Sequence, residues 1–161
     1  MMHYSFFFLH LLQILAFGML IMTKISAEQG VVVVEITTAA PADSPMVTSE
    51  HYYTSMVTLY IENDDGSKTP SGWSTRKEHG ALHGVDAPFE FQPGLNLIVG
   101  WTEGVLQMKE GERALLHVPS AKGYGGKPMG QKGGAFFIPE NSNLLFDIEI
   151  LGKAGSTDSE F

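Results

Sequence analysis

Apolar residues along the chain alternate with polar ones in several short runs, and turn residues separate these runs. The clearest alternation lies near the C-terminal end, where Leu144, Phe146, Ile148 and Ile150 fall on one face of a strand over residues 144–151. β-Branched or alternating apolar residues predict further strands over 31–36, 56–61, 89–91 and 113–119.

One stretch has helical rather than alternating spacing. From Asn96 to Met108, apolar residues stand at positions 97, 98, 101, 105, 106 and 108, which predicts a helix with Asn96 as its N-cap and Gly111 beyond its end. Residues 67–86 are polar and glycine-rich, and we expect a long loop or a broken edge strand there. Residues 123–134 hold six glycines and one proline and must form a loop. Several strands and one short helix predict an α+β fold with an antiparallel sheet.

The N-terminal part of the chain has a different character. Residues 6–22 are nearly all apolar, and small residues follow, as is typical of a signal peptide over residues 1–27 with cleavage after Ala27. The apolar run is shorter than the about 20 residues of a spanning helix, and an uncleaved signal anchor is the alternative. We therefore expect one domain over 28–153 and a polar tail over 154–161, located in the secretory pathway. No ER-retention tetrapeptide is present, so the ER lumen and secretion are not distinguished.

Composition narrows the classes of function. The chain has 161 residues, with 10 Lys and Arg against 18 Asp and Glu and a net charge of −8, which argues against nucleic acid as a partner. A hydrophobic content of 43% favours a folded domain over a disordered chain. Cysteine is absent, which excludes disulfides, thiolate zinc sites and a cysteine nucleophile.

Motifs for nucleotide or metal binding fail when their spacing is examined. Residues 123–127 look like a phosphate loop, but a proline follows where the loop needs Ser or Thr. An EF-hand counted back from Gly66 would begin at Ile61, which has no side-chain oxygen, and a hairpin turn explains the segment better. His79 and His83 form only a weak metal-binding pair without a third ligand. We expect neither a metal nor a cofactor.

A longer pattern identifies the chain with a known family. Residues 94–114 read GLNLIVGWTEGVLQMKEGERA and closely resemble the central motif of FKBP-type peptidyl-prolyl cis-trans isomerases, G…VIxGWxEGVxxMxxGxRA. The Gly-Tyr-Gly sequence at 123–125 is similar to the family's AYG step, and residues 138–151 are similar to its IPP…LxFDVELL ending. The resemblance covers residues 87–152, about half of the expected mature chain.

The resemblance implies a twisted antiparallel β-sheet wrapped around one short α-helix, with an apolar pocket between them. In that pocket Trp101 would form the floor, the backbone N–H of Ile98 would bind the substrate carbonyl, and Tyr124 would place a hydroxyl at the rim. Phe89 and Phe146 would be walls. The implied catalytic residues are therefore Trp101, Ile98, Tyr124, Phe89 and Phe146.

Four more residues are implied to bind the substrate. Trp73 takes the place of the family's Phe after the Asp-Gly turn, and Ser74 stands where the family has Asp. The early pocket tyrosine is Tyr60 by strand phase or Tyr53 by local sequence order, and we favour Tyr60. The loop over 125–137 is longer than the short family version and carries two phenylalanines. The implied substrate-binding residues are Tyr60, Trp73, Leu97 and Ile138.

The resemblance also implies an activity, namely rotation of X–Pro bonds in secretory or extracellular polypeptides by a desolvated aromatic pocket without covalent chemistry. Expected partners are proline-containing polypeptides and macrolides such as tacrolimus and rapamycin, and a membrane only if the N-terminal segment stays attached. The alternative is a non-catalytic FKBP-like binding or chaperone module with reduced or no turnover, because a fold does not fix a function.

Overall fold

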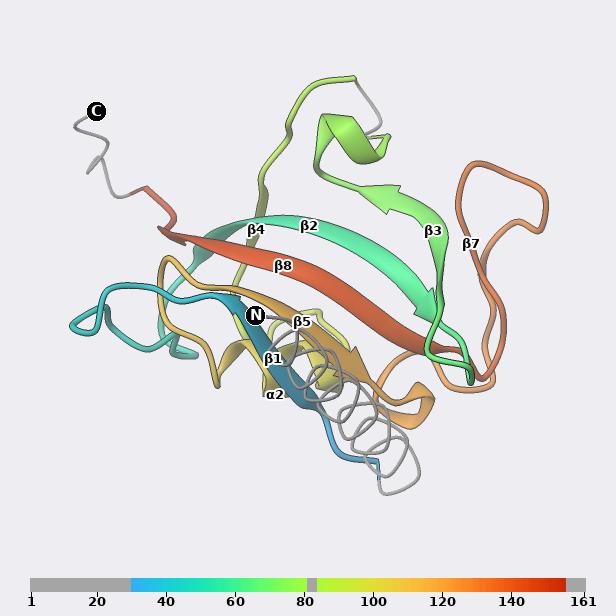
Figure 1. The fold of residues 1–161 in the computed structure, drawn as a ribbon, viewed down its shortest axis with the longest axis horizontal. Helices are drawn as coiled ribbons and strands as arrows, with labels where there is room; N and C mark the ends of the chain where they lie inside the picture. The colour runs from blue at the N-terminus through green and yellow to red at the C-terminus, as the bar shows by residue number, and fades with distance from the viewer. Residues whose placement is uncertain (1–29, 81–83, 156–161) are drawn as a thin grey trace, which may run out of the picture.

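Strands make up most of the regular secondary structure in the computed structural model, which describes residues 30–80 and 84–155 (Figure 1). The main sheet has six antiparallel strands in the order β1-β5-β8-β2-β3, and β4 pairs with β2 beside this path. Strands β6 and β7 form a separate two-stranded hairpin. The strand bounds are β1 Val33–Thr38, β2 Tyr53–Glu62, β3 Lys68–Ser74, β4 Phe89–Phe91, β5 Arg113–Val118, β6 Met129–Gly130, β7 Phe137–Ile138 and β8 Asn143–Lys153.

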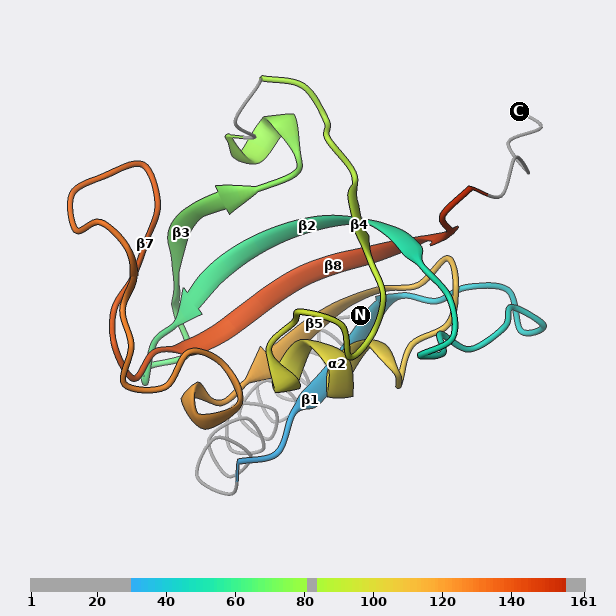
Figure 2. The same ribbon diagram turned by 180° about the vertical axis from the view of Figure 1, so that it is seen from behind.

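One α-helix is present in the described part of the chain, α2 over Val99–Val105, and the curved sheet wraps around it (Figures 1 and 2). Two short 3-10 helices, Lys77–His79 and Ser120–Lys122, lie in the connections. The expected fold class, a twisted antiparallel sheet around one short helix, is confirmed. A helix of seven residues is too short to be stable alone, so its packing against the sheet must hold it.

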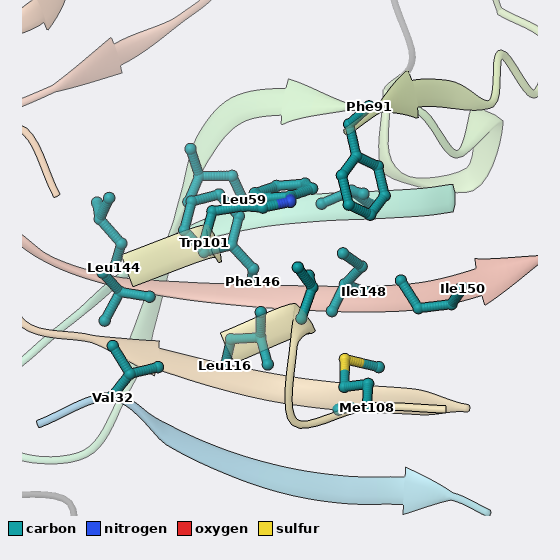
Figure 3. Packing of buried hydrophobic residues seen from close by; sticks show 14 of the residues in the cluster. Val32, Leu59, Phe91, Trp101, Met108, Leu116, Leu144, Phe146, Ile148 and Ile150 are labelled. Carbon is teal, nitrogen blue, oxygen red and sulfur yellow. The ribbon is translucent and has the colours of Figure 1, made fainter. Parts of the chain in front are cut away.

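The longest strands, β2 and β8, form the centre of the sheet and pair from Tyr53 with Lys153 to Glu62 with Asn143. The predicted apolar face of β8 is confirmed, because Leu144, Phe146, Ile148 and Ile150 are at most 3% exposed. They pack with Leu59, Leu116 and Trp101 in a single hydrophobic core, which Figure 3 shows from close by.

Two glycines allow α2 to lie against the sheet. A Cβ at Gly100 would overlap Cγ1 of Val118, and a Cβ at Gly104 would lie 2.8 Å from Cδ1 of Leu116. Both partners stand on β5, so any larger residue at these positions would push the helix outward. Trp101 is placed between these two contacts and faces the core.

The predicted helix is longer than the observed one at both ends. Asn96 is not the N-cap, because it lies in the left-handed region with φ of 55° in the turn before the helix, a conformation that asparagine tolerates better than most residues. The N-cap is Ile98, whose side chain makes no capping bond. Thr102 ties the turn to the helix instead, since its hydroxyl accepts the N–H of Gly94 at 3.0 Å.

The expected loop or broken edge strand over 67–86 is a strand followed by irregular structure. β3 pairs with β2, and a bulge between Thr58 and Tyr60 shifts the register. Gly72 in β3 has φ of +87°, and a Cβ there would overlap the carbonyl oxygen of Ala135 in the β6–β7 hairpin. This glycine therefore allows the hairpin to pack directly on the edge of the sheet.

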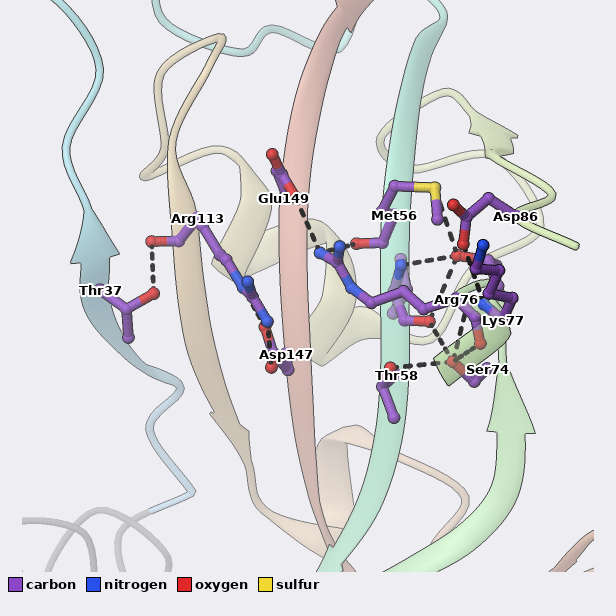
Figure 4. Close-up of polar contacts among 12 residues, drawn as sticks. Thr37, Met56, Thr58, Ser74, Arg76, Lys77, Asp86, Arg113, Asp147 and Glu149 are labelled. Carbon is purple, nitrogen blue, oxygen red and sulfur yellow. Dashed lines mark hydrogen bonds and ion pairs between the residues drawn. The ribbon is translucent and has the colours of Figure 1, made fainter. Parts of the chain in front are cut away.

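The outer face of the sheet, away from α2, is polar and carries ion pairs (Figure 4). Arg113 binds both carboxylate oxygens of Asp147 at 2.8 and 2.9 Å. The buried Arg76 donates to Glu149 at 2.9 Å and to the carbonyl of Met56 at 3.3 Å. Burial alone would raise the pKa of Asp147, but the hydrogen bonds and charge of Arg113 outweigh burial and lower it.

The expected signal peptide over 1–27, its signal-anchor alternative and most of the polar tail over 154–161 fall outside the described residues. Within residues 30–80 and 84–155, no helix has the length and apolar content needed to cross a membrane.

The hairpin contact predicts a difference between two glycine substitutions. Gly72 and Gly94 have nearly the same φ, +87° and +86°, but a Cβ at Gly94 meets no atom within 4 Å. Both alanine variants should lose about 1 kcal/mol through the left-handed backbone. Gly72→Ala should lose about 1–3 kcal/mol more in urea unfolding because its methyl group displaces the hairpin. Equal losses in the two variants would contradict the contact.

The Arg113–Asp147 pair predicts a pH-dependent stability. A lowered carboxyl pKa stabilises the fold above the unfolded value of about 4, and this stabilisation disappears as the pH falls through the lower folded value. Asp147→Asn should therefore lower the free energy of unfolding at pH 7 by about 1 kcal/mol, since Arg113 is partly exposed. The gap to the wild type should close as the pH falls through the lowered folded-state pKa, because the carboxyl group is then protonated in both the folded and the unfolded state. Glu90→Gln, at an exposed position on β4, is the control.

Candidate functional site

A cavity of about 350 Å³ opens between α2, the inner face of the sheet and the β6–β7 hairpin. Its walls are mostly apolar, and none of the residues around it is charged. The lining residues come from β2, β3, β4, α2 with the turn before it, β8 and the segment from 124 to 136. They are Leu59, Trp73, Phe89, Asn96, Leu97, Ile98, Trp101, Tyr124, Met129, Phe136 and Phe146.

Aromatic rings fix the indole of Trp101 at the base of this cavity. Phe146 on β8 lies 5.0 Å from it between ring centroids, Phe91 lies at 5.5 Å and Phe89 at 5.8 Å, and all three pairs meet edge to face. Such edge-to-face pairs contribute about 0.5–1.5 kcal/mol beyond the burial of their area. Trp101 itself is 4% exposed, so its orientation is fixed by packing on three sides. Figure 3 shows the indole between Leu59 and Phe91.

The second tryptophan of the chain closes the cavity from the β3 side. Trp73 is half-buried and meets Phe89 edge to face at 5.9 Å. Since the chain has two tryptophans and both line the cavity, tryptophan fluorescence reports on this site.

The start of α2 brings a backbone donor to the cavity. Leu97 and Ile98 line it, and the Ile98 N–H has no hydrogen-bond partner among residues 30–80 and 84–155. The first N–H groups of a helix have no partner within the helix, which explains why this donor is available.

Tyr124 follows the 3-10 helix Ser120–Lys122 and contributes a polar atom to the rim. Burial raises the pKa of its hydroxyl above the ordinary tyrosine value. The side chain therefore stays neutral across the physiological range and can donate or accept a hydrogen bond.

Seven of the nine residues implied by the resemblance meet around the cavity, namely Trp101, Ile98, Tyr124, Phe89, Phe146, Trp73 and Leu97. Their catalytic and binding roles stay predictions. The placement of the other two, Tyr60 and Ile138, differs from the expectation. Ile138, the last residue of β7, is 1% exposed in the hydrophobic core and is not among the residues that line the cavity.

Tyr60 lies on the opposite face of the sheet, so its assignment to the pocket was wrong. Leu59 points into the cavity, and the next residue of a strand must point away from it. Tyr60 instead packs under the ammonium group of Lys68, 4.3 Å above its ring, and beside His79. The alternative, Tyr53, is fully buried, and its hydroxyl accepts the N–H of Thr48 at 2.9 Å.

Ser74 does not face the cavity either. Its hydroxyl lies 2.9 Å from that of Thr58 and accepts the N–H of Arg76 at 3.0 Å, on the outer side of β2 (Figure 4). Ser74 is therefore part of the hydrogen-bond network on the outer side of the sheet, and its neighbour Trp73 is the residue that forms the cavity wall.

Four lining residues were not expected from the sequence: Leu59, Asn96, Met129 and Phe136. Leu59 belongs to a run, residues 56–61, that has apolar residues on both faces of the strand, so the run does not reveal which residues face inward. Met129 and Phe136 reach the cavity because they stand at the base of the β6–β7 hairpin, where Gln131 N–H bonds to the Phe136 carbonyl at 3.2 Å. The aromatic pair in a glycine-rich loop was the available signal for this hairpin.

The arrangement suits binding and desolvation rather than acid–base or metal chemistry. Within the described residues, no group of three His, Cys, Asp or Glu side chains could hold a metal ion. The cavity offers an aromatic base, a backbone N–H and a neutral hydroxyl. Such a site binds an apolar ring and fixes a nearby carbonyl.

Comparison with known sequences agrees with this geometry. The model of the family described as FKBP-type peptidyl-prolyl cis-trans isomerase matches residues 58–151. FK506-binding protein 2 of Dictyostelium discoideum is 44% identical over 66 residues, which are 40% of this chain and 46% of that protein. FK506-binding protein 1 of Gibberella zeae is 52% identical over 54 residues, 34% of this chain and 44% of that protein. The chain thus spans about half the length of these curated relatives.

Solved structures have the same fold. The crystal structure of AtFKBP13 superposes with a TM-score of 0.58 at 25% identity, over 76% of this chain and 93% of that one. The three FKBP domains of wheat FKBP73 give a TM-score of 0.57 at 20% identity, over 76% of this chain and 46% of that one.

Proposed function

Because the chain belongs to the FKBP-type peptidyl-prolyl cis-trans isomerase family, we propose that it accelerates rotation about X–Pro peptide bonds. The proline ring enters the cavity and rests on Trp101. The carbonyl of the residue before proline accepts the N–H of Ile98, and Tyr124 hydrogen-bonds at the rim.

Physical chemistry explains why such a cavity suits the reaction. Resonance keeps the peptide bond planar and gives it a rotation barrier of about 18–20 kcal/mol. Resonance is lost at the twisted transition state and the dipole of the C–N unit falls, so a dry apolar site favours the twisted form over the planar one. A thousandfold acceleration requires only about 4 kcal/mol of such preference. No nucleophile, proton transfer or metal is needed.

The observation that carries this proposal is the combination of an immobile indole and an unpaired backbone N–H in one apolar cavity. Trp101 is fixed by three phenylalanine rings, so the cavity does not have to form when the substrate arrives. The donor at Ile98 belongs to a helix start that is itself packed on β5. Binding energy can therefore act on the substrate rather than on ordering the site.

A second candidate is a binding module of the same fold with little or no turnover. Ser74, where the family has an acidic residue, uses its hydroxyl on the outer side of the sheet and supplies no charge to the cavity. The long hairpin adds Met129 and Phe136 to the wall, which favours retention of an apolar segment. Peptide binding without turnover would support this candidate.

We also propose that the clients are exported proteins. The support is the apolar segment over residues 6–22 with the small residues that follow it. Sequencing the N-terminus of the exported protein tests this, because a start at Glu28 indicates a cleaved signal peptide and a start at Met1 an anchor.

Removing the indole should reduce turnover more than a core change of similar severity. Trp101→Ala should lower kcat/KM on a Leu-Pro peptide at least about tenfold, equivalent to about 1.4 kcal/mol. Met108→Ala, at a fully buried position that does not line the cavity, is the matched control for lost stability. Cis–trans exchange measured by NMR reports the rate, and circular dichroism confirms that both variants are folded. Unchanged turnover in folded Trp101→Ala would place the reaction elsewhere.

Macrolides that bind this family should enter the same cavity. Tacrolimus or rapamycin at micromolar concentration should change the tryptophan emission in a saturable way, because both indoles line the site. Trp73→Phe and Trp101→Phe assign the signal to one ring or the other. An unchanged spectrum at micromolar ligand would show that the hairpin has reshaped the cavity against these compounds.

A further inference from the structure

Positive charge is concentrated in one part of an acidic chain. Residues 113–139 contain no Asp or Glu and four of the ten Lys and Arg residues, although the whole chain carries a net charge of −8. Two of the four cations are paired, Arg113 with Asp147 and Lys122 with Glu103. The other two, Lys127 and Lys132, are exposed and have no side-chain partner within residues 30–80 and 84–155.

These two lysines belong to the segment that forms one side of the cavity. Lys127 lies between two lining residues, Tyr124 and Met129. Lys132 lies in the turn between β6 and β7, which the hydrogen bond from Gly134 N–H to the Gln131 carbonyl closes at 2.9 Å. Figures 1 and 2 both show this segment, in orange, standing beside β3.

The hairpin is held in place. Gly72 of β3 lies directly against the backbone of Ala135, and a Cβ at Gly130 would overlap the carbonyl of Phe136. Asn141 N–H bonds to the carbonyl of Gly125 at 2.6 Å and closes the base of the segment. The segment that carries the two lysines is therefore anchored beside the cavity.

We propose that Lys127 and Lys132 make this site selective for proline segments that carry an acidic residue within about three residues of the proline. The inference rests on the proposed binding of X–Pro segments in the cavity. The lining itself has no charge, and Lys127 and Lys132 are the charged residues of the segment from Tyr124 to Phe136 that lines the hairpin side. The chain as a whole has a net charge of −8, so a preference for an acidic segment has to come from local positive charge.

Distance and screening set the size of the effect. Three extended residues span about 10 Å, and the screening length in physiological salt is about 8 Å. A carboxylate within that span stays within reach of flexible lysine side chains. Exposed ion pairs are weak, so two of them should raise kcat/KM about threefold to tenfold at low salt.

The test compares peptides that differ in one charge. A common Ala-Leu-Pro-Phe core carries Glu, Gln or Lys at one of three positions on either side, and NMR exchange gives kcat/KM for each. The ratio of Glu to Gln peptides should be about threefold to tenfold at the best position and approach one in about 0.5 M salt.

Charge variants of the full chain separate a selectivity role from a structural one. Lys127→Gln with Lys132→Gln should bring the Glu-to-Gln ratio to about one, and Lys127→Glu with Lys132→Glu should invert it. Lys109→Gln is the matched control, since this lysine is bonded to the carbonyl of Ala42, does not line the cavity and changes the net charge by the same amount per site. A lost preference in Lys109→Gln would indicate a general charge effect and overturn the proposal.

A ratio of one for the wild type at every position, or a ratio unchanged in the double glutamine variant, also overturns it. Tryptophan fluorescence titrations with the same peptides keep this test apart from the proposed activity. If no peptide is turned over, the isomerase proposal fails, while the Glu-to-Gln ratio of Kd still decides the charge preference.

Discussion

The close approach of α2 to β5 is the constraint on which the rest of the molecule depends. Gly100 and Gly104 leave no side chain between the helix and the sheet, so Val118 and Leu116 fill the space directly. Trp101 is thereby pressed into the concave face of the sheet, where phenylalanine rings surround it. A larger residue at either glycine would lift the helix, and the base of the cavity would rise with it.

Side chains along the long central strands point alternately to the two faces of the sheet, so the residues of the cavity and those of the ion pairs lie on opposite faces. On β2 and β8 the inward residues, among them Leu59 and Phe146, build the core and the cavity. The outward residues form ion pairs, such as Asp147 with Arg113. Charged groups are thus available to stabilise the fold while the cavity stays uncharged, which a site that works by desolvation requires.

How much could be predicted depended on whether the signal was local. The strict alternation of β8 and the short Phe-Glu-Phe strand of β4 were predicted from the sequence alone, and the family motif led to most of the cavity. Tyr60 was assigned to the wrong face because the run from 56 to 61 has large apolar or aromatic residues on both faces, and such a run fixes no phase. Asn96 was predicted to be the N-cap because asparagine is common at that position. Its left-handed backbone depends on the turn that the Thr102 hydroxyl holds, and this contact is not visible in the sequence. Phe136 and Met129 were missed because their place depends on a contact with β3, far away in the sequence.

The junction between Gly72 and Ala135 divides the hairpin into two parts with different freedom. On the side of the junction nearer to Tyr124 and Ile138, the chain packs against the core and tolerates little change. On the other side, residues 131–134 form the turn of the hairpin, which only backbone hydrogen bonds of the hairpin itself hold together. Sequence drift, or a grafted insertion, in that turn can therefore alter what the protein selects without disturbing how it folds, so recognition and stability can evolve separately.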